Sequence, residues 1–199
     1  QIIASNCFGL KALLEDSGAV VRILPIACDT IPALQMVFDL ALTADLIVTI
    51  GGASVGDHDL VAEAGKTLGM DQSFYKVAMR PGKPLMAGRI KDTPIVGLPG
   101  NPVSSMVCGH IFLTPMIRHM LGLPAEQTRH ALAPLACAIE KNGPREHYMR
   151  ASFYDGQLTP FDRQDSALLS VLSQANALLV RPPHAPELKA GVEVPYILL

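Results

Sequence analysis

Three glycines and two acids follow an apolar run in residues 47–61, IVTIGGASVGDHDLV. Glycine tolerates positive φ angles and lets a ligand come close to main-chain N–H groups. Asp57 and Asp59 come next, and Mg²⁺ binds in proteins through one or two carboxylates together with substrate phosphates. The stretch is therefore a candidate cradle for an anionic ligand with a metal beside it. In the alternative interpretation, Asp57 only caps a helix and Asp59 is a solvated acid in its first turn.

A second candidate group is basic and lies in residues 76–84, KVAMRPGKP. Along a strand, Lys76 and Arg80 would share one face. The Pro81-Gly82 turn can then bring Lys83 to the same side. Fixed cations hold phosphoryl oxygens and stabilise charge that develops on them. The alternative is a solvated hairpin with basic residues at its edge.

A third group, GLPGNPVSS, repeats the pattern of the first at residues 97–105. A strand again ends in turn residues and leads into a helix, with Asn101 predicted as the N-cap and Pro102 at the first helical position. Two such junctions on either side of one basic segment are more specific than either junction alone. The sequence contains no Walker A loop, no G-x-G-x-x-G, no G-x-S-x-G and no metal-binding Cys/His spacing.

The elements that must position these groups alternate along the chain. The patterns predict helices over 7–17, 31–42, 57–68 and 102–121, and strands over 19–26, 44–50, 74–79 and 93–98. Strands that are apolar on both faces and alternate with helices predict an α/β fold of three layers with a mostly parallel sheet. In such sheets the ligand crevice lies beyond the carboxyl ends of the strands, where the two glycine-rich junctions fall.

The pattern of alternating strands and helices ends after Leu123. A polar linker is followed by short strand-like runs over 131–140, 147–154, 177–180 and 192–199, with a hairpin signal at Asp155-Gly156 and one short helix over 166–174. We expect an α/β domain over 1–123 and a small, mostly β, barrel-like domain over 124–199. A polar cluster around Arg145 and Arg150 is either paired on the surface or the rim of a neighbouring crevice.

Composition excludes several classes of protein. The hydrophobic share of 49% and the charged share of 17% indicate a packed globular protein. A net charge of −2 without a Lys/Arg run argues against nucleic acid as a partner. The longest uncharged run, 93–117, is broken by prolines and glycines and does not predict a membrane span. Four scattered cysteines are typical of reduced thiols in a cytoplasmic protein.

Three segments in one order and spacing carry a resemblance: GGASVGDHDLV, KVAMRPGKPLMAGRI and VGLPGNPVSS. They resemble the molybdopterin molybdenumtransferase family, the MoeA-like group that includes the E domain of gephyrin. SALLSVLSQANALLV at 166–180 resembles the C-terminal β domain of that family. The resemblance implies a three-layer molybdopterin-binding domain followed by a small barrel-like domain. It also implies Mg²⁺-dependent insertion of molybdate into adenylylated molybdopterin, with release of AMP.

The resemblance assigns roles to residues of this chain. The implied pterin-binding residues are Gly51, Gly52, Ser54, Val55, Gly56, Pro99, Gly100, Asn101 and Ser104. The implied catalytic residues are Asp57, Asp59, Lys76, Arg80 and Lys83, with Asp57 or, preferably, Asp59 linked to Mg²⁺ and the three cations gripping phosphate or molybdate. The substrates would be small molecules, the full-length protein a homodimer, and the molybdopterin adenylyltransferase the source of the adenylylated substrate.

The chain departs from the family at its start and leaves other functions open. The family's α/β domain begins one strand earlier, with an S-T-G-D-E-like turn, and further N-terminal domains precede it; a fragment of a longer protein is therefore expected. One alternative is the molybdopterin adenylyltransferase, against which the β domain after Leu123 argues. Another is a non-catalytic scaffold of the gephyrin kind, for which the sequence specifies no partner.

Overall fold

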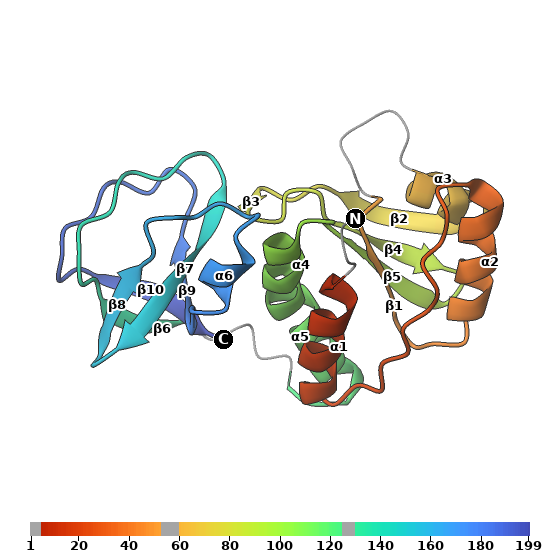
Figure 1. The fold of residues 1–199 in the computed structure, drawn as a ribbon, viewed down its shortest axis with the longest axis horizontal. Coiled ribbons are helices and arrows are strands. Elements are labelled where there is room, and N and C mark those ends of the chain that lie inside the picture. The colour runs from red at the N-terminus through yellow and green to blue at the C-terminus, as the bar shows by residue number, and fades with distance from the viewer. Residues whose placement is uncertain (1–4, 53–59, 125–129) are drawn as a thin grey trace.

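The computed structural model describes residues 5–52, 60–124 and 130–199. Two sheets lie side by side; the longer helices lie against the first of them, and the short helix α6 (Leu169–Leu172) lies beside the second (Figure 1). The α/β class and the order of the two parts are as predicted. No helix among the described residues is long and apolar enough to span a membrane.

The first sheet has the strand order β1-β5-β4-β2. These strands are β1 (Ile47–Ile50), β2 (Met70–Tyr75), β4 (Met86–Ile90) and β5 (Thr93–Leu98). β1 and β5 run parallel, whereas β5–β4 and β4–β2 are antiparallel. The prediction of a mostly parallel sheet is thus wrong for the described ladders. The reason is β4, which the sequence pattern missed: β4 and β5 are joined by a turn at Lys91 and Asp92, and a short turn can join only antiparallel strands.

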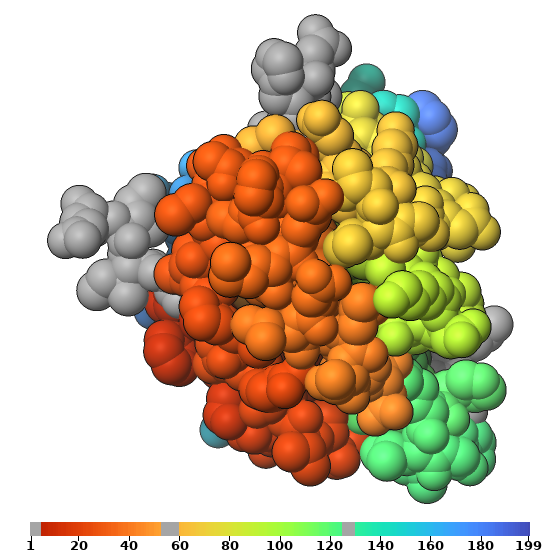
Figure 2. Space-filling view, turned by 90° about the vertical axis from the view of Figure 1, so that its right-hand side faces the viewer, coloured from red at the N-terminus to blue at the C-terminus, as the bar shows by residue number. Residues whose placement is uncertain are grey.

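Helices cover both faces of this sheet, which gives the expected three layers (Figure 1). They are α1 (Asn6–Asp16), α2 (Ile31–Ala41), α3 (Leu60–Thr67), and α4 (Pro102–Cys108), which continues through a π-helical turn (Gly109–Leu113) into α5 (Thr114–Met120). One apolar cluster joins α1, α4 and α5 to β5, and a second joins α2 and α3 to β1 and β4. Figure 2 shows that α2 and the segment before it cover much of the outer face of this layer.

The predicted strand over 19–26 is not a strand in the structure. The segment does not pair with β1 or with another described strand. One side-chain contact links it to α2, because Arg22 Nη2 donates to the carbonyl of Leu40. Its apolar residues divide between two environments, because Val21 and Leu24 pack on the two cores while Val20 and Ile26 are exposed. Apolar content alone therefore overstated how deeply this segment is buried.

The second sheet has the order β3-β7-β9-β10-β6, with β8 paired to β7. Its elements are β3 (Met79–Arg80), β6 (Ala131–Pro134), β7 (Glu146–Tyr154), β8 (Gln157–Pro160), β9 (Ala177–Arg181) and β10 (Glu193–Leu198), with the short helix α6 (Leu169–Leu172). The hairpin at Asp155-Gly156 forms as predicted, with both residues at positive φ. The described ladders do not close into a barrel, since only a bridge between Leu135 and Leu158 links the end of β6 to β8.

β3 connects the two halves of the molecule. It follows the first-sheet strand β2 in sequence, yet it pairs in parallel with β7 of the second sheet. The single strand predicted over 74–79 is therefore divided: β2 ends at Tyr75, Lys76 adopts a φ of +72°, and the chain crosses to the other sheet. The halves also share a core, because Tyr148 and Val180 belong to the same apolar cluster as Val103.

Candidate functional site

The two glycine-rich junctions meet at one edge of the first sheet. β1 and β5 are parallel neighbours with Ile50 opposite Leu98, so both strands end at the same level. The amide of Gly51 donates to the carbonyl of Leu98 at 2.9 Å. A Cβ built on Gly100 would lie 3.4 Å from the Cα of Gly51, so the two backbones approach closely. The parallel register thus places both junctions beside one another, as the ligand crevice of such a sheet requires.

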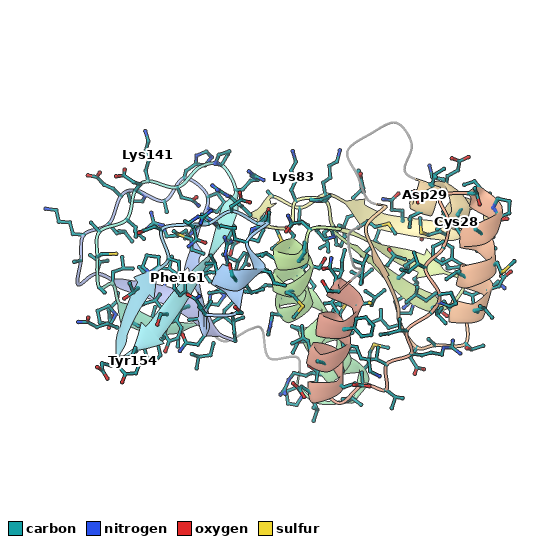
Figure 3. All side chains as sticks on the ribbon, viewed as in Figure 1. Cys28, Asp29, Lys83, Lys141, Tyr154 and Phe161 are labelled. Atoms are coloured by element: carbon teal, nitrogen blue, oxygen red, sulfur yellow. The ribbon has the colours of Figure 1, made fainter. Side chains whose placement is uncertain are left out.

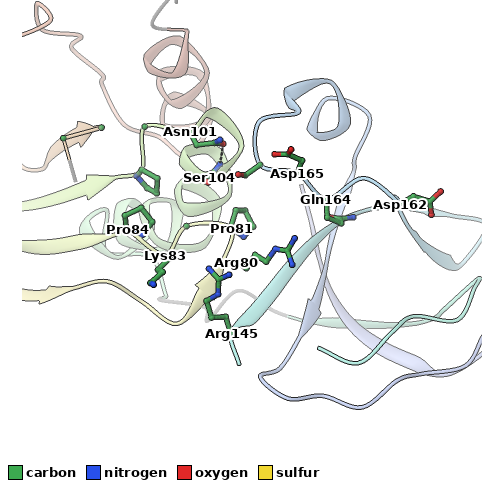
Figure 4. A pocket seen from close by; sticks show the side chains of 16 residues that line it. Arg80, Pro81, Lys83, Pro84, Asn101, Ser104, Arg145, Asp162, Gln164 and Asp165 are labelled. Carbon is green, nitrogen blue, oxygen red and sulfur yellow. Dashed lines mark hydrogen bonds between the residues drawn. The ribbon is translucent and has the colours of Figure 1, made fainter. Parts of the chain in front are cut away.

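The junctions open into a cleft of about 820 Å³ between the two sheets (Figure 4). Three groups of residues line it. The strand-end wall is Gly51, Gly52, Pro99, Gly100, Asn101 and Ser104; the basic loop is Arg80, Pro81, Gly82, Lys83 and Pro84; the β7 wall is Arg145, Asp162, Gln164, Asp165 and Ser166. The cleft therefore combines close-approaching backbone, three cations and two acids.

The residues singled out from the sequence divide into three sets. Those that line the cleft are Gly51, Gly52, Arg80, Lys83, Pro99, Gly100, Asn101 and Ser104. Those that lie outside the described residues are Ser54, Val55, Gly56, Asp57 and Asp59. Lys76 is described but does not line the cleft, and its Nζ lies 4.8 Å from the ring centroid of Tyr75. The expectation that Lys76 and Arg80 share a strand face is wrong, because the chain turns at Lys76.

Side chains of the first helical turn hold the strand-end wall in place. Asn101 caps α4, and its Oδ1 accepts from the amide of Ser104 at 3.4 Å. Ser105 Oγ donates to the carbonyls of Pro99 and Asn101. Asn6 of α1 donates from Nδ2 to the carbonyl of Gly100 at 2.8 Å. Since the amides of Gly51 and Ser104 already have partners, the backbone cradle offers fewer free donors than the glycine pattern alone predicts.

The basic loop is fixed at its base and exposed at its tip. The amide of Lys76 donates to the carbonyl of Leu85 at 2.8 Å, and that of Val77 donates to the carbonyl of Lys83 at 3.1 Å. Gly82 has a φ of +109°, and a Cβ there would overlap the Cys108 thiol of α4, so the loop lies close against that helix. Figure 3 shows Lys83 projecting from the molecule between the two halves.

The β7 wall was largely missed by sequence reasoning. Only Arg145 carried a signal, as a possible rim residue, and β7 begins directly after it. Arg80 and His147 are partners in the β3–β7 ladder, which brings the basic loop to this wall. Asp162, Gln164 and Asp165 lie on a segment without strand or helix, and no pattern in the sequence connects them with the glycine-rich junctions. Only tertiary structure brings these residues to the cleft.

Positive charge gathers where β3 meets β7. Burial, followed by the charges of Arg80, Arg150, Arg145 and Arg181, lowers the pKa of His147 to about 4. Arg150 is fully buried, and burial together with Arg80 lowers its pKa while Asp165 acts in the opposite direction. At neutral pH His147 is therefore uncharged, and the positive charge of this region comes from arginines.

The described residues contain no group of three or more His, Cys, Asp or Glu side chains placed to hold a metal ion. Asp162 and Asp165 are the carboxylates that line the described cleft. The two acids proposed for Mg²⁺, Asp57 and Asp59, fall in the range 53–59 outside the description.

Family comparisons agree with this architecture. Residues 1–119 match a family model described as a probable molybdopterin binding domain. The chain belongs to this molybdopterin-binding family. Residues 132–199 match a second model, the MoeA C-terminal region (domain IV). The strand-end wall and the basic loop lie in the molybdopterin-binding region, and the β7 wall lies in the MoeA C-terminal region.

Curated relatives match nearly the whole chain. Molybdopterin molybdenumtransferase 2 of Mycobacterium tuberculosis (strain CDC 1551 / Oshkosh) is 35% identical over 204 residues, which are 98% of this chain and 50% of the relative. The molybdopterin molybdenumtransferase of Nostoc sp. is 34% identical over 206 residues, which are 98% of this chain and 47% of the relative. The chain thus spans about half the length of these relatives.

A solved structure shows the same fold. The crystal structure of the molybdopterin biosynthesis MoeA protein from Pyrococcus horikosii superposes with a TM-score of 0.84, covering 100% of this chain and 48% of that one at 24% identity. The α/β part followed by a β part is therefore a fold known from MoeA, and at this identity the likeness concerns the fold alone.

Proposed function

We propose that this chain is the pterin-binding part of an enzyme that inserts molybdate into adenylylated molybdopterin and releases AMP. One observation carries the proposal: two strand-to-helix junctions, a basic loop with two cations and a third cation, Arg145, line a single cleft of about 820 Å³. A phosphorylated ligand needs such a combination of close backbone and fixed cations. The names of the curated relatives supply the reaction class.

The chemistry asks this chain to bind and orient its substrates. A water oxygen attacks the adenylate phosphorus, the phosphoanhydride bond breaks with molybdopterin phosphate as the leaving group, and the adenylyl group departs as AMP. If a molybdate oxygen attacks instead, water must then cleave the adenylyl–molybdate bond to give AMP. Such a reaction depends on position and on stabilisation of charge, so no protein nucleophile is required. Arg80 and Lys83 would hold phosphate or molybdate oxygens, and Arg145 would add a third cation from the other side. Lys76 lies outside the cleft and has no part in this proposal.

The strand-end wall would hold the pterin-side phosphate through Gly52, Gly100 and Asn101, with Ser104 beside them. The proposal also includes the predicted Ser54, Val55 and Gly56. Mg²⁺, bound through Asp59 or Asp57, would supply neutralisation of charge on the phosphate oxygens.

The rest of the proposal concerns the protein as a whole. We place the division of the chain at residues 123 and 124, and we place the enzyme in the cytoplasm as a homodimer. Its substrate would come from the molybdopterin adenylyltransferase. The match of residues 132–199 to the MoeA C-terminal region supports the transferase over the adenylyltransferase itself.

An AMP-release assay tests the proposal. Adenylylated molybdopterin and Mg²⁺ are incubated with the chain, molybdate is added, and AMP is followed by chromatography. Molybdate-dependent release is expected from the full-length protein, and binding of the adenylylated pterin is expected from the chain alone. Asp59→Ala should abolish insertion and leave pterin binding measurable. Insertion by that variant at the unaltered rate would remove Asp59 from the site.

A further inference from the structure

One side-chain amide attaches the segment after β8 to β7. Gln164 Nε2 donates to the carbonyl of Arg150 at 2.9 Å, and the amide of Arg150 donates to Gln164 Oε1 at 3.0 Å. Paired residues of an antiparallel ladder exchange the same two bonds through their backbones. The β7–β8 ladder ends at Ala151 and Pro160, so Gln164 extends the pairing beyond the last strand residue. It also donates to the carbonyl of Phe161 at 2.6 Å, which closes the segment upon itself.

This attached segment forms most of the β7 wall. Asp162, Asp165 and Ser166 line the cleft together with Gln164. Arg150 reinforces the attachment from below, since its buried Nη2 donates to the carbonyl of Asp165 at 3.2 Å. Figure 4 places Gln164 and Asp165 across the cleft from Lys83 and Pro84. The amide of Phe161 donates to the carbonyl of Arg150 at 3.0 Å, which is a main-chain bond to β7. Beyond Phe161, the bonds that hold the wall residues to β7 come from the side chains of Gln164 and Arg150.

The attachment has an electrostatic consequence. Within the described part of the chain, the one ion pair joins Lys11 and Glu15, so neither acid of the β7 wall is paired with a cation of the cleft. When an exposed acid and an exposed cation come within reach of one another, their interaction contributes about 0.2–1 kcal/mol, which is up to about a fivefold change in an equilibrium constant. A wall segment released from β7 would let Asp165 reach Arg80 or Arg145 and compete with an anionic ligand for them. The fixed segment keeps the acids in the cleft and apart from its cations.

We propose that Gln164 is a positioning residue: its two-way bond to Arg150 holds the β7 wall so that Asp165 does not neutralise the cations that receive an anion. The proposal deepens the function proposed above and rests on it for the identity of the natural ligand. Its own requirement is simpler, namely that the cleft binds a phosphate-like anion.

The same strand supplies a matched control. Asn176 makes an equivalent two-way bond to Phe153 of β7: the amide of Phe153 donates to Asn176 Oδ1 at 2.7 Å, and Asn176 Nδ2 donates to the carbonyl of Phe153 at 3.0 Å. Asn176 does not line the cleft. A change at Asn176 therefore removes the same kind of bond from the same strand without touching the wall.

The test measures inorganic phosphate binding to the chain by isothermal titration calorimetry. Gln164→Met keeps length and neutrality and removes the two bonds to Arg150 together with the bond to Phe161. The dissociation constant should rise about fivefold, which corresponds to one exposed ion pair in competition with the anion. Amide exchange over 161–168 should accelerate. Asp165→Asn added to Gln164→Met should restore the affinity, because the competing charge is gone. Asn176→Leu should stay within about twofold of the unaltered chain, since its bond lies outside the cleft.

Several results would overturn the proposal. They are unchanged phosphate binding by Gln164→Met, equal weakening by Asn176→Leu, absence of rescue by Asp165→Asn, or no phosphate binding by the unaltered chain. If Gln164→Met does not fold, Gln164→Asn keeps the amide but is too short to reach both backbone groups, and it should show the same loss and rescue. If the chain binds phosphate but the full-length protein releases no AMP, the proposed function is wrong and this inference still stands.

Discussion

The two walls of the cleft are held in place by different means. The strand-end wall consists of backbone at the ends of two parallel strands, and the β1–β5 ladder and the cap of α4 fix it. Most of the β7 wall lies on a segment without regular structure, and beyond the main-chain bond of Phe161 to Arg150 only side-chain bonds among the described residues attach it to β7. Main-chain ladders depend little on which side chains are present, whereas a side-chain attachment can be lost through one substitution. The first wall is therefore a property of the fold, and the second is a property of a few residues.

The largest effect is expected from weakening the strand-end wall through its core. Leu98 is fully buried at the end of β5, and Leu98→Ala should lower the free energy of unfolding by about 2–5 kcal/mol in urea titration. Amide exchange should accelerate in β1 and α4. Equal acceleration in β6 and β8, whose buried residues belong to a separate apolar cluster, would show that the two walls do not differ in their support.

A pH dependence tests the β7 side. Because the pKa of His147 is about 4 in the fold and near 6.5 when unfolded, the unfolded chain takes up the proton first on acidification. This contribution to stability is complete above pH 6.5 and is lost as pH falls towards 4, on the order of 3 kcal/mol in total. Urea unfolding at pH 7 and pH 4.5 should show the loss, and His147→Gln should reduce it. If the unfolding free energy of His147→Gln depends on pH as strongly as that of the unaltered chain, His147 is not the group responsible.

Substitution of Arg80 tests the cations that lie between the two walls of the cleft. Arg80→Ala should weaken binding of adenylylated molybdopterin about 10- to 100-fold, because a hydrogen bond to a charged group contributes about 1.5–3 kcal/mol. The affinity of Arg80→Lys should lie between those of the unaltered chain and Arg80→Ala, because lysine keeps the charge but lacks the planar fork of the guanidinium group. Titration calorimetry measures all three. Binding by Arg80→Lys as weak as by Arg80→Ala would show that the fork matters more than the charge.

The smallest effect should come from the cation outside the cleft. Lys76→Ala should change ligand affinity by less than about twofold, whereas Lys83→Ala should weaken it about tenfold, because only Lys83 lines the cleft. The two variants remove the same charge from positions seven residues apart. Equal losses in the same titration would mean that the general field of the basic segment, and no specific contact, attracts the ligand.

Much of the strand-end wall could be predicted from the sequence because its signals are local. The apolar runs ending in Gly51 and Pro99, and the Asn101-Pro102 start of α4, are each visible within a few residues. The prediction of strands failed where strand pairing depends on residues that are distant in the sequence. β4 makes the sheet mixed, and the positive φ of Lys76 divides one expected strand between two sheets.

The β7 wall could not be predicted for a related reason. Gln164 acts through the backbone of Arg150, fourteen residues earlier, and nothing in the local sequence marks a glutamine as a partner of a strand. The low pKa of His147 likewise depends on arginines from three strands and from the residue before β7. Such effects arise from tertiary structure, whereas a strand end or an N-cap arises from the order of residues.

The crossing of the chain at β3 has a consequence for the shape of the site. Arg80 belongs to the second sheet through its pairing with His147, while the carbonyl of Lys83 bonds to Val77 near the first sheet. A rotation of one half against the other would change the distance between the two cations. A rigid ligand that contacts both cations would therefore bind best at one angle between the halves. The spacing of the two cations thus couples ligand binding to the relative orientation of the two halves.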